Sequence, residues 1–148
     1  MNSMSIDDGD YEEKQDIVAK LVQLDQEMFP NPIKDKDGDR MTFGYGTAGF
    51  RTLGDNLDQV CFRVAILVAI RAKMTGSAGM MITASHNPKD DNGVKIIEDN
   101  GDVLPVSWEP YAEQIVNSSN LEETLHQLFD TLERKFKFRN TEFLPGGK

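Results

Sequence analysis

The clearest hydrophobic pattern in the chain predicts a long helix in its first half. From Asp55, a residue type that often caps helix N-termini, apolar side chains follow one helical face until about Gly76. A weaker helical repeat ends at Met28, just before two prolines, and residues 1–15 ahead of it are polar and acidic. We therefore expect a loose tail, one modest helix and a polar loop ahead of the main helix.

Two further helices are predicted in the second half of the chain. Ser107 is the expected N-cap of a helix that runs to about Ser118, with Pro110 in the first turn, where proline is tolerated. A final helix is indicated by apolar residues three or four positions apart, namely Leu121, Leu125, Leu128, Leu132 and Phe136. A polar tail that contains Pro145, Gly146 and Gly147 is expected after it.

Short apolar and alternating segments between the helices predict strands. Residues 78–83 form an apolar run, which predicts a buried strand that carries the next polar loop at its carboxyl end, where open α/β sheets bind ligands. Residues 94–98 and 103–104 flank an Asn-Gly turn, the pattern of a hairpin. Residues 41–45 form an extended segment. Because helix and strand patterns alternate, we expect an α/β fold, a three-layer α/β/α domain with a small mixed sheet between helices.

Composition and charge limit the classes of function. The length of 148 residues, 39% of them hydrophobic, fits one domain with a single core. A formal net charge of −9 disfavours a general affinity for nucleic acid or membrane, so an anionic ligand needs a local cationic pocket. Cys61 is the only cysteine, which excludes an internal disulfide. Without a signal pattern or a long apolar run, we expect a cytoplasmic protein, whose oligomeric state the sequence leaves open.

A glycine motif in the first half matches a cofactor fingerprint only in part. Gly44, Gly46 and Gly49 have the spacing of a dinucleotide-binding loop. That loop follows a strongly apolar strand and opens directly into a helix, whereas the segment before these glycines is polar and the helix is expected only from Asp55. A nicotinamide or flavin cofactor, and with it an oxidoreductase, is therefore disfavoured.

An acidic segment matches a calcium loop equally poorly. Asp35, Asp37 and Asp39 have the alternation of its first ligands. However, Arg40 stands where such a loop requires glycine, and Gly46 stands where it requires a closing acidic residue. A solvated acidic turn is the favoured interpretation.

The polar loop after residues 78–83 contains the candidate nucleophile. Ser85, next to His86 on a turn fixed by Pro88, has the setting of a nucleophile or phosphate carrier. A phosphoserine needs cations or amide donors nearby. The cations available are Arg51, His86, Lys89 and Lys95. From spacing alone, an ordinary polar loop in which Ser85 and Asn87 bond backbone groups is the favoured interpretation.

Two sequence strings change that balance. ITASHNPKDDNGVK, residues 82–95, resembles the phosphoserine loop of the α-D-phosphohexomutases, and GTAGFR, residues 46–51, is similar to the N-terminal signature of that superfamily. The resemblance covers about residues 42–116, and it is closest to the eukaryotic members that act on N-acetylglucosamine phosphates. It divides the chain into an N-terminal tail, helix and loop at 1–40, domain I with the phosphoserine loop at 41–118, and a divergent C-terminal helix and tail at 119–148.

The resemblance implies a phosphohexose mutase, an isomerase that interconverts N-acetylglucosamine 6-phosphate and 1-phosphate through a bisphosphate, for UDP-N-acetylglucosamine synthesis. By this likeness Ser85 carries the phosphoryl group, and its phosphate binds Mg²⁺. Lys95 would assist proton transfer or neutralise charge, while Arg51, His86 and Asn87 would hold the phosphate. These are the expected catalytic and phosphosugar-binding residues.

Members of this superfamily have further functional loops that we do not recognise in this sequence. The family's metal loop, sugar-specificity loop and C-terminal phosphate loop are not recognisable after Val116. We therefore expect a truncated serine domain, and the activity of this chain alone stays open. The alternatives are a non-catalytic fragment or isoform that keeps the fold, and a phosphoglucomutase-type relative.

Overall fold

The structure, a computed structural model, describes the backbone of residues 8–136 and the side chains of residues 15–136. It divides into two compact units. One unit contains the helices α1 (Asp8–Met28) and α4 (Leu121–Phe136). The other, Phe29–Ser119, contains every residue that the sequence analysis assigned to a functional site.

In the first unit, α1 and α4 pack against each other. The leucine pattern predicted α4 correctly, and Leu125 and Leu132 on its apolar face are fully buried. α1 begins at Asp8, inside the segment expected to be a tail; its first residues are acidic, and negative side chains favour a helix N-terminus. Among residues 8–136, no helix is both long and apolar enough to cross a membrane. The predicted tail after α4 lies outside the described residues.

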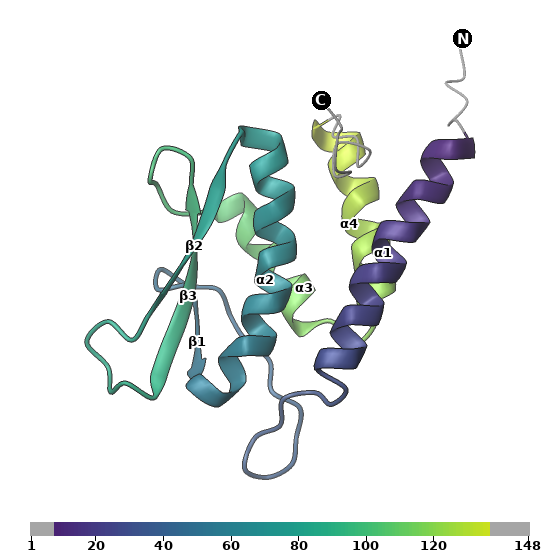
Figure 1. Cartoon of the computed structure of the whole chain (residues 1–148). Coiled ribbons are helices and arrows are strands. Elements are labelled where there is room, and N and C mark those ends of the chain that lie inside the picture. The colour runs from purple at the N-terminus through teal and green to yellow at the C-terminus, as the bar shows by residue number, and fades with distance from the viewer. Residues whose placement is uncertain (1–7, 137–148) are drawn as a thin grey trace. The chain divides into compact units, whose positions relative to one another are not determined.

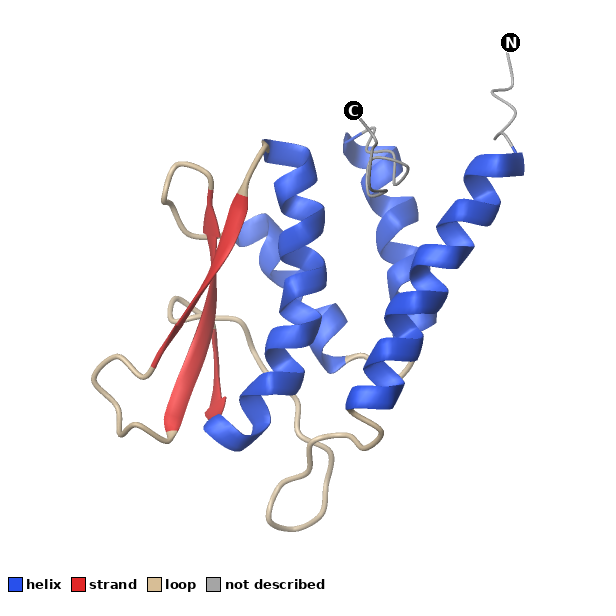
Figure 2. Ribbon diagram, viewed as in Figure 1, coloured by secondary structure: helices blue, strands red, loops and turns tan. Residues whose placement is uncertain are grey.

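The second unit combines a three-stranded sheet with helices, as Figure 1 and Figure 2 show. Its elements in chain order are β1 (Phe50–Leu53), α2 (Gly54–Thr75), β2 (Ala78–Thr83), β3 (Asp91–Glu98), the 3-10 helix η1 (Val106–Trp108) and α3 (Glu109–Asn117). α2 lies along one face of the sheet, where it contacts all three strands, and it also packs against α3. The prediction of an α/β domain is confirmed.

The sheet is antiparallel rather than mixed. Its strand order is β1-β3-β2, and β3 runs antiparallel to both neighbours. β2 and β3 are joined only by residues 84–90, and such a short connection can return the chain only in the opposite direction. β1 and β2, joined through α2, do run parallel, but β3 lies between them and separates them.

Strand β2 has the predicted bounds but the wrong predicted burial. It is an edge strand, and the side chains of Met80, Met81 and Ile82 are 37%, 45% and 54% exposed. The buried central strand is β3, in which Val94 and Ile96 have no exposed surface. An apolar run of this length does not reveal which strand lies at an edge, because the order of strands depends on long-range pairing.

The predicted hairpin around the Asn-Gly turn forms only in part. The turn is present, with Gly101 N–H donating to the Glu98 carbonyl (3.0 Å) and Glu98 N–H donating to Asp102 (2.8 Å). Beyond it, Ile97 and Val103 form a single isolated bridge, so residues 103–104 are no full strand. The hairpin that matters is β2–β3, and its turn is the loop that contains Ser85.

The predicted C-terminal ends of α2 and α3 are confirmed, at Gly76 and Ser118, whereas the two predicted N-caps are wrong. Gly76 ends α2 with a φ of 102°, and its N–H donates to the Ala72 carbonyl (2.8 Å). The N-cap of α2 is Leu53, whereas Asp55 lies in the first turn. Ser107 likewise caps no α-helix, since it lies inside η1. α2 therefore begins earlier than predicted, directly after β1, and a 3-10 turn takes the position of Ser107.

Side chains of α3 hold the segment 41–45 in place. The Asn117 amide pairs with both backbone groups of Phe43, accepting from its N–H (2.7 Å) and donating to its carbonyl (2.7 Å). The Glu113 carboxylate accepts the Tyr45 N–H (2.8 Å). Residues 41–45 form no strand; side chains of α3 hold Phe43 and Tyr45, and Met41 N–H donates to the Ile33 carbonyl (2.8 Å).

A buried arginine joins α2 to the end of α3. Nη1 of Arg63 donates to the carbonyls of Ile115 (3.1 Å), Val116 (3.3 Å) and Ser118 (2.7 Å). These carbonyls lie at the C-terminus of a helix, where intrahelical donors run out; Ile115 accepts only a long bond from the Ser118 N–H (3.4 Å) besides that from Arg63. Arg63 thus satisfies them inside the core and fixes α3 against α2.

Candidate functional site

Two of the predicted cationic residues share one face of the sheet. The register pairs Arg51 of β1 with Gly93 of β3, and Gly93 with Thr83 of β2. Side chains of paired residues point to the same face, as does that of Lys95, two positions beyond Gly93. The opposite face carries the fully buried Phe50 and meets α2. Arg51 and Lys95 therefore stand on the face that α2 leaves uncovered.

The Ser85 loop connects β2 to β3 at one end of this face. Ser85 has a φ of 54°, the left-handed region, and is the one non-glycine residue with positive φ within residues 8–136. Its N–H donates to Thr83 Oγ1 (2.9 Å), while Asn87 N–H donates to the Ala84 carbonyl (3.0 Å). A serine seldom adopts this conformation, and such strain is concentrated at functional sites. The predicted nucleophile is also exposed to solvent.

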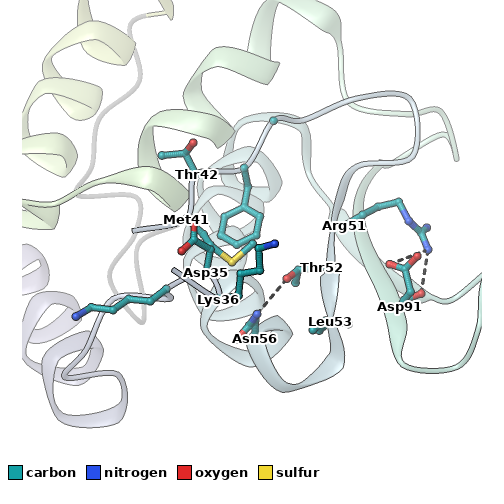
Figure 3. Close-up of a pocket in the computed structure, with 12 residues that line it drawn as sticks. Asp35, Lys36, Met41, Thr42, Arg51, Thr52, Leu53, Asn56 and Asp91 are labelled. Atoms are coloured by element: carbon teal, nitrogen blue, oxygen red, sulfur yellow. Dashed lines mark hydrogen bonds and ion pairs between the residues drawn. The ribbon is translucent and has the colours of Figure 1, made fainter. Parts of the chain in front are cut away.

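Arg51 ties the two ends of the loop together. Its Nη2 donates to the carbonyls of Ala84 (3.2 Å) and Asp91 (3.0 Å), the first residue of the loop and the residue directly after it. The same nitrogen forms an ion pair with Asp91 Oδ1 at 3.8 Å (Figure 3). Asp91 Oδ2 in turn accepts from the Asn87 amide (2.7 Å). The structure thereby brings two predicted phosphate-binding residues, Arg51 and Asn87, to one carboxylate.

Asp91 is a site residue that the sequence pattern did not predict. The residue belongs to the string that carries the resemblance, but an aspartate within an Asp-Asn-Gly turn is ordinary turn chemistry. Only the pairing of β1 with β3 places it beside Arg51, which is 40 positions away in the chain. No local signal could have identified this contact.

The remaining predicted residues stand apart from this network. The side chains of His86 and Lys95 make no hydrogen bond or ion pair with the rest of the described chain, and the same holds for Lys89. His86 and Lys89 are exposed, and Lys95 is half-buried. Their side chains are therefore available to a ligand near the loop.

Gly49 allows close approach of the backbone at the site. Gly49 has a φ of 73°, and a Cβ atom there would lie 2.1 Å from the Val94 carbonyl oxygen. It also closes a tight turn, in which Gly49 N–H donates to the Gly46 carbonyl (2.9 Å). Gly46 and Gly49 form the turn before β1, and Gly49 also allows the close contact with β3.

The acidic turn uses its carboxylate on its own backbone. Asp35 Oδ1 accepts the N–H groups of Asp37 (2.8 Å) and Asp39 (2.9 Å). In the part of the chain whose side chains are described, no three His, Cys, Asp or Glu side chains are grouped so that they could hold a metal ion.

A pocket of about 510 Å³ adjoins Arg51 on the side away from the loop. It lies between the segment 34–44 and the start of α2, and Arg51, Asp91 and Asn56 line it (Figure 3). Ser85, His86 and Lys95 do not line it. The pocket is therefore not the place where a group on Ser85 would react.

Comparison with known proteins agrees with the geometry. Residues 56–123 match the family model described as phosphoglucomutase/phosphomannomutase, alpha/beta/alpha domain I. The phosphoacetylglucosamine mutase of Saccharomyces cerevisiae is 49% identical over 109 residues, 70% of this chain and 20% of that protein. The enzyme of the same name from Arabidopsis thaliana is 41% identical over 120 residues, 80% of this chain and 20% of its own length.

Solved structures give the same result. A crystal structure of an N-acetylglucosamine-phosphate mutase in its substrate complex matches with a TM-score of 0.65 and 40% identity, over 76% of this chain and 22% of that one. The Aspergillus fumigatus N-acetylphosphoglucosamine mutase, in complex with GlcNAc-6P and magnesium, matches with a TM-score of 0.63 and 36% identity, over 78% and 20%. The chain spans about a fifth of the length of these relatives. It therefore belongs to the α-D-phosphohexomutase superfamily and contains its domain I.

Proposed function

We propose that this chain is the phosphoserine domain of a mutase that interconverts N-acetylglucosamine 6-phosphate and N-acetylglucosamine 1-phosphate, for UDP-N-acetylglucosamine synthesis. The observation that carries the proposal is Ser85, held in a left-handed conformation on a loop that Arg51 clamps at both ends. The names of the relatives support the choice of the sugar. A cytoplasmic location and the boundaries 41–118 for domain I belong to the same proposal.

In this proposal Ser85 Oγ carries the phosphoryl group. A sugar hydroxyl attacks phosphorus, the bond from phosphorus to Ser85 Oγ breaks, and the hydroxyl proton leaves to a base. The resulting sugar bisphosphate reorients and returns its other phosphoryl group to Ser85 Oγ, so that phosphate and protons balance over the cycle. Such transfer depends mainly on positioning and on neutralisation of charge.

Four further residues have roles in the proposal. Lys95, on the uncovered face of the sheet, assists proton transfer or neutralises charge as phosphorus moves. Arg51, His86 and Asn87 hold the phosphate on Ser85, since each offers donors at or beside the loop. The phosphosugar is the expected partner.

Mg²⁺ fits this site only in part. A phosphate on Ser85 would supply one oxygen ligand, and the ion would neutralise charge on the phosphoryl group during transfer. The described side chains include no acidic cluster that could complete its coordination. We therefore place the remaining ligands outside the described part of this chain.

A second candidate is a non-catalytic domain that keeps the fold without turnover. The observation that favours it is coverage of about a fifth of the relatives' length. Only the enzyme requires a complete metal site, so metal-dependent turnover distinguishes the two candidates. A mutase for a different hexose phosphate would be distinguished by the sugar it converts.

The test incubates the chain with Mg²⁺ and a hexose 1,6-bisphosphate labelled in its phosphates, and follows label on the protein and product sugar by mass spectrometry. We expect label on Ser85, its loss in Ser85→Ala, and its retention in Ser107→Ala, which removes an equally exposed serine in η1. Label without sugar turnover would identify a phosphoserine domain that needs further domains. Absence of label from a folded chain would favour the non-catalytic candidate.

A further inference from the structure

The Asp91 side chain binds the Asn87 amide and lies beside the Arg51 guanidinium, two groups to which we assign phosphate binding. Its Oδ2 accepts the Asn87 amide at 2.7 Å, and its Oδ1 lies 3.8 Å from Arg51 Nη2. Arg51 also bonds the carbonyl of Ala84, the residue next to Ser85. One carboxylate thus faces two of the groups to which we assign phosphate binding.

We propose that Asp91 is a positioning residue: its carboxylate holds Arg51 and Asn87 at the loop while Ser85 carries no phosphate, and yields them when Ser85 is phosphorylated. The inference rests on the proposed function, because it assumes that Ser85 becomes phosphorylated. It goes beyond that function, because in the unphosphorylated loop the Asp91 carboxylate takes the place of the phosphate.

The relative strength of the two anions favours the exchange. A phosphoserine carries a charge of about −1.5 to −2 and three acceptor oxygens, against one charge and two oxygens on a carboxylate. The pair between Asp91 and Arg51 is long, and the side chains are 42% and 25% exposed, so solvent weakens it. Repulsion between phosphate and carboxylate acts in the same direction.

The backbone contacts of Arg51 do not depend on the exchange. Nη2 bonds the carbonyls of Ala84 and Asp91, and these acceptors stay in place whichever anion is present. The guanidinium has five N–H donors, so Nε and Nη1 are available to a phosphate while Nη2 keeps its carbonyls. Arg51 can therefore pass from carboxylate to phosphate without leaving the loop.

The test measures how phosphorylation and Asp91 affect each other. The full chain is made with serine or with phosphoserine at position 85, the latter incorporated during translation, and each form is made with and without Asp91→Asn. Thermal unfolding of the four proteins is compared. We expect Asp91→Asn to lower the midpoint of the unphosphorylated chain by about 2–4 °C, from the loss of one charged hydrogen bond. In the phosphorylated chain we expect a shift under about 1 °C, because phosphate has replaced the carboxylate.

Asp90→Asn is the matched control. It removes the same charge one position earlier, but the Asp90 side chain makes no hydrogen bond or ion pair with the rest of the described chain. Asp90→Asn should therefore change the unfolding midpoint only slightly, and by the same amount in the phosphorylated and the unphosphorylated chain. An equal loss of stability from Asp91→Asn in both forms would assign Asp91 a merely structural role and overturn the inference.

A spectroscopic readout separates the two forms directly. In ¹⁵N spectra of the same chains, the Asn87 side-chain amide should shift on phosphorylation of Ser85, and also in unphosphorylated Asp91→Asn. An unchanged Asn87 signal on phosphorylation would overturn the inference. Since phosphoserine is introduced without turnover, failure of the labelling test for the mutase leaves this result interpretable by itself.

Discussion

Gly93 lies directly across the sheet from Arg51 and leaves room for its side chain. A methyl group on Gly93 would lie 3.2 Å from both Cγ and Nη1 of Arg51, and 2.9 Å from the Phe50 carbonyl oxygen. The glycine therefore serves packing at the site, since it lets the guanidinium extend across β3 toward the Ser85 loop.

Replacing Gly93 should disturb both stability and the loop. We expect Gly93→Ala to lower the free energy of unfolding by about 1–3 kcal/mol, because the added methyl group contacts backbone that cannot move away freely. Urea unfolding measures the change.

Gly79→Ala is the control for a strand glycine, since a Cβ at Gly79 would have no atom within 4 Å. Its effect should lie within about 1 kcal/mol and should favour folding, because alanine restricts the unfolded chain. Equal effects of the two substitutions would contradict the packing role of Gly93.

Arg63→Met should be among the more damaging substitutions in the second unit. It keeps the apolar stem but removes the donor for three carbonyls at the end of α3, inside the core. We expect a loss of about 2–5 kcal/mol in the free energy of unfolding, because buried acceptors are left without partners. Denaturant unfolding followed by circular dichroism measures it.

Arg134→Met supplies the comparison for loss of an arginine. This side chain is exposed on α4 and, among residues 8–136, donates within its own helix, to the Asp130 carbonyl (3.3 Å). Its replacement should change stability by about 0.5 kcal/mol or less. If Arg63→Met lost no more unfolding free energy than Arg134→Met, the prediction would be wrong, and water would have replaced the lost donor.

The buried phenol of Tyr45 should make the protein less stable at alkaline pH. Burial raises the pKa of Tyr45 above its usual value of 10.0, and the negative charge of Glu109 raises it further. The hydrogen bond from the Ile96 N–H lowers the pKa, but by less than burial raises it. Because the folded pKa is raised, the neutral phenol is favoured in the folded state. Its contribution to stability is complete below pH 10 and is lost as pH rises through the folded pKa.

Unfolding free energies measured between pH 8 and 11 test this in Tyr45→Phe. That variant loses the hydroxyl that accepts the Ile96 N–H (2.9 Å), so it should be less stable at pH 8 by about 1–3 kcal/mol. Its stability should also fall less above pH 10. Tyr111→Phe, which removes a different phenol, should keep the wild-type alkaline loss, and an identical pH profile in all three proteins would contradict the assignment to Tyr45.

Local pattern was sufficient where one element carries its own signal. The leucine spacing predicted α4, the glycine after Thr75 predicted the end of α2, and the apolar run at residues 78–83 predicted the bounds of β2. β1 was missed, since its four residues lie between a glycine turn and a helix and show no alternation that a pattern could reveal.

By itself, the sequence determined the helices, the α/β class and, through two strings of residues, the family and the candidate nucleophile Ser85. Those features depend on neighbours along the chain, whose spacing determines the periodicity and the turns. Only the tertiary structure decided that β3 is central and β2 lies at an edge, and that Asp91 joins Arg51 to Asn87. These features depend on pairings between distant segments, which bring together donors and acceptors that no local pattern relates.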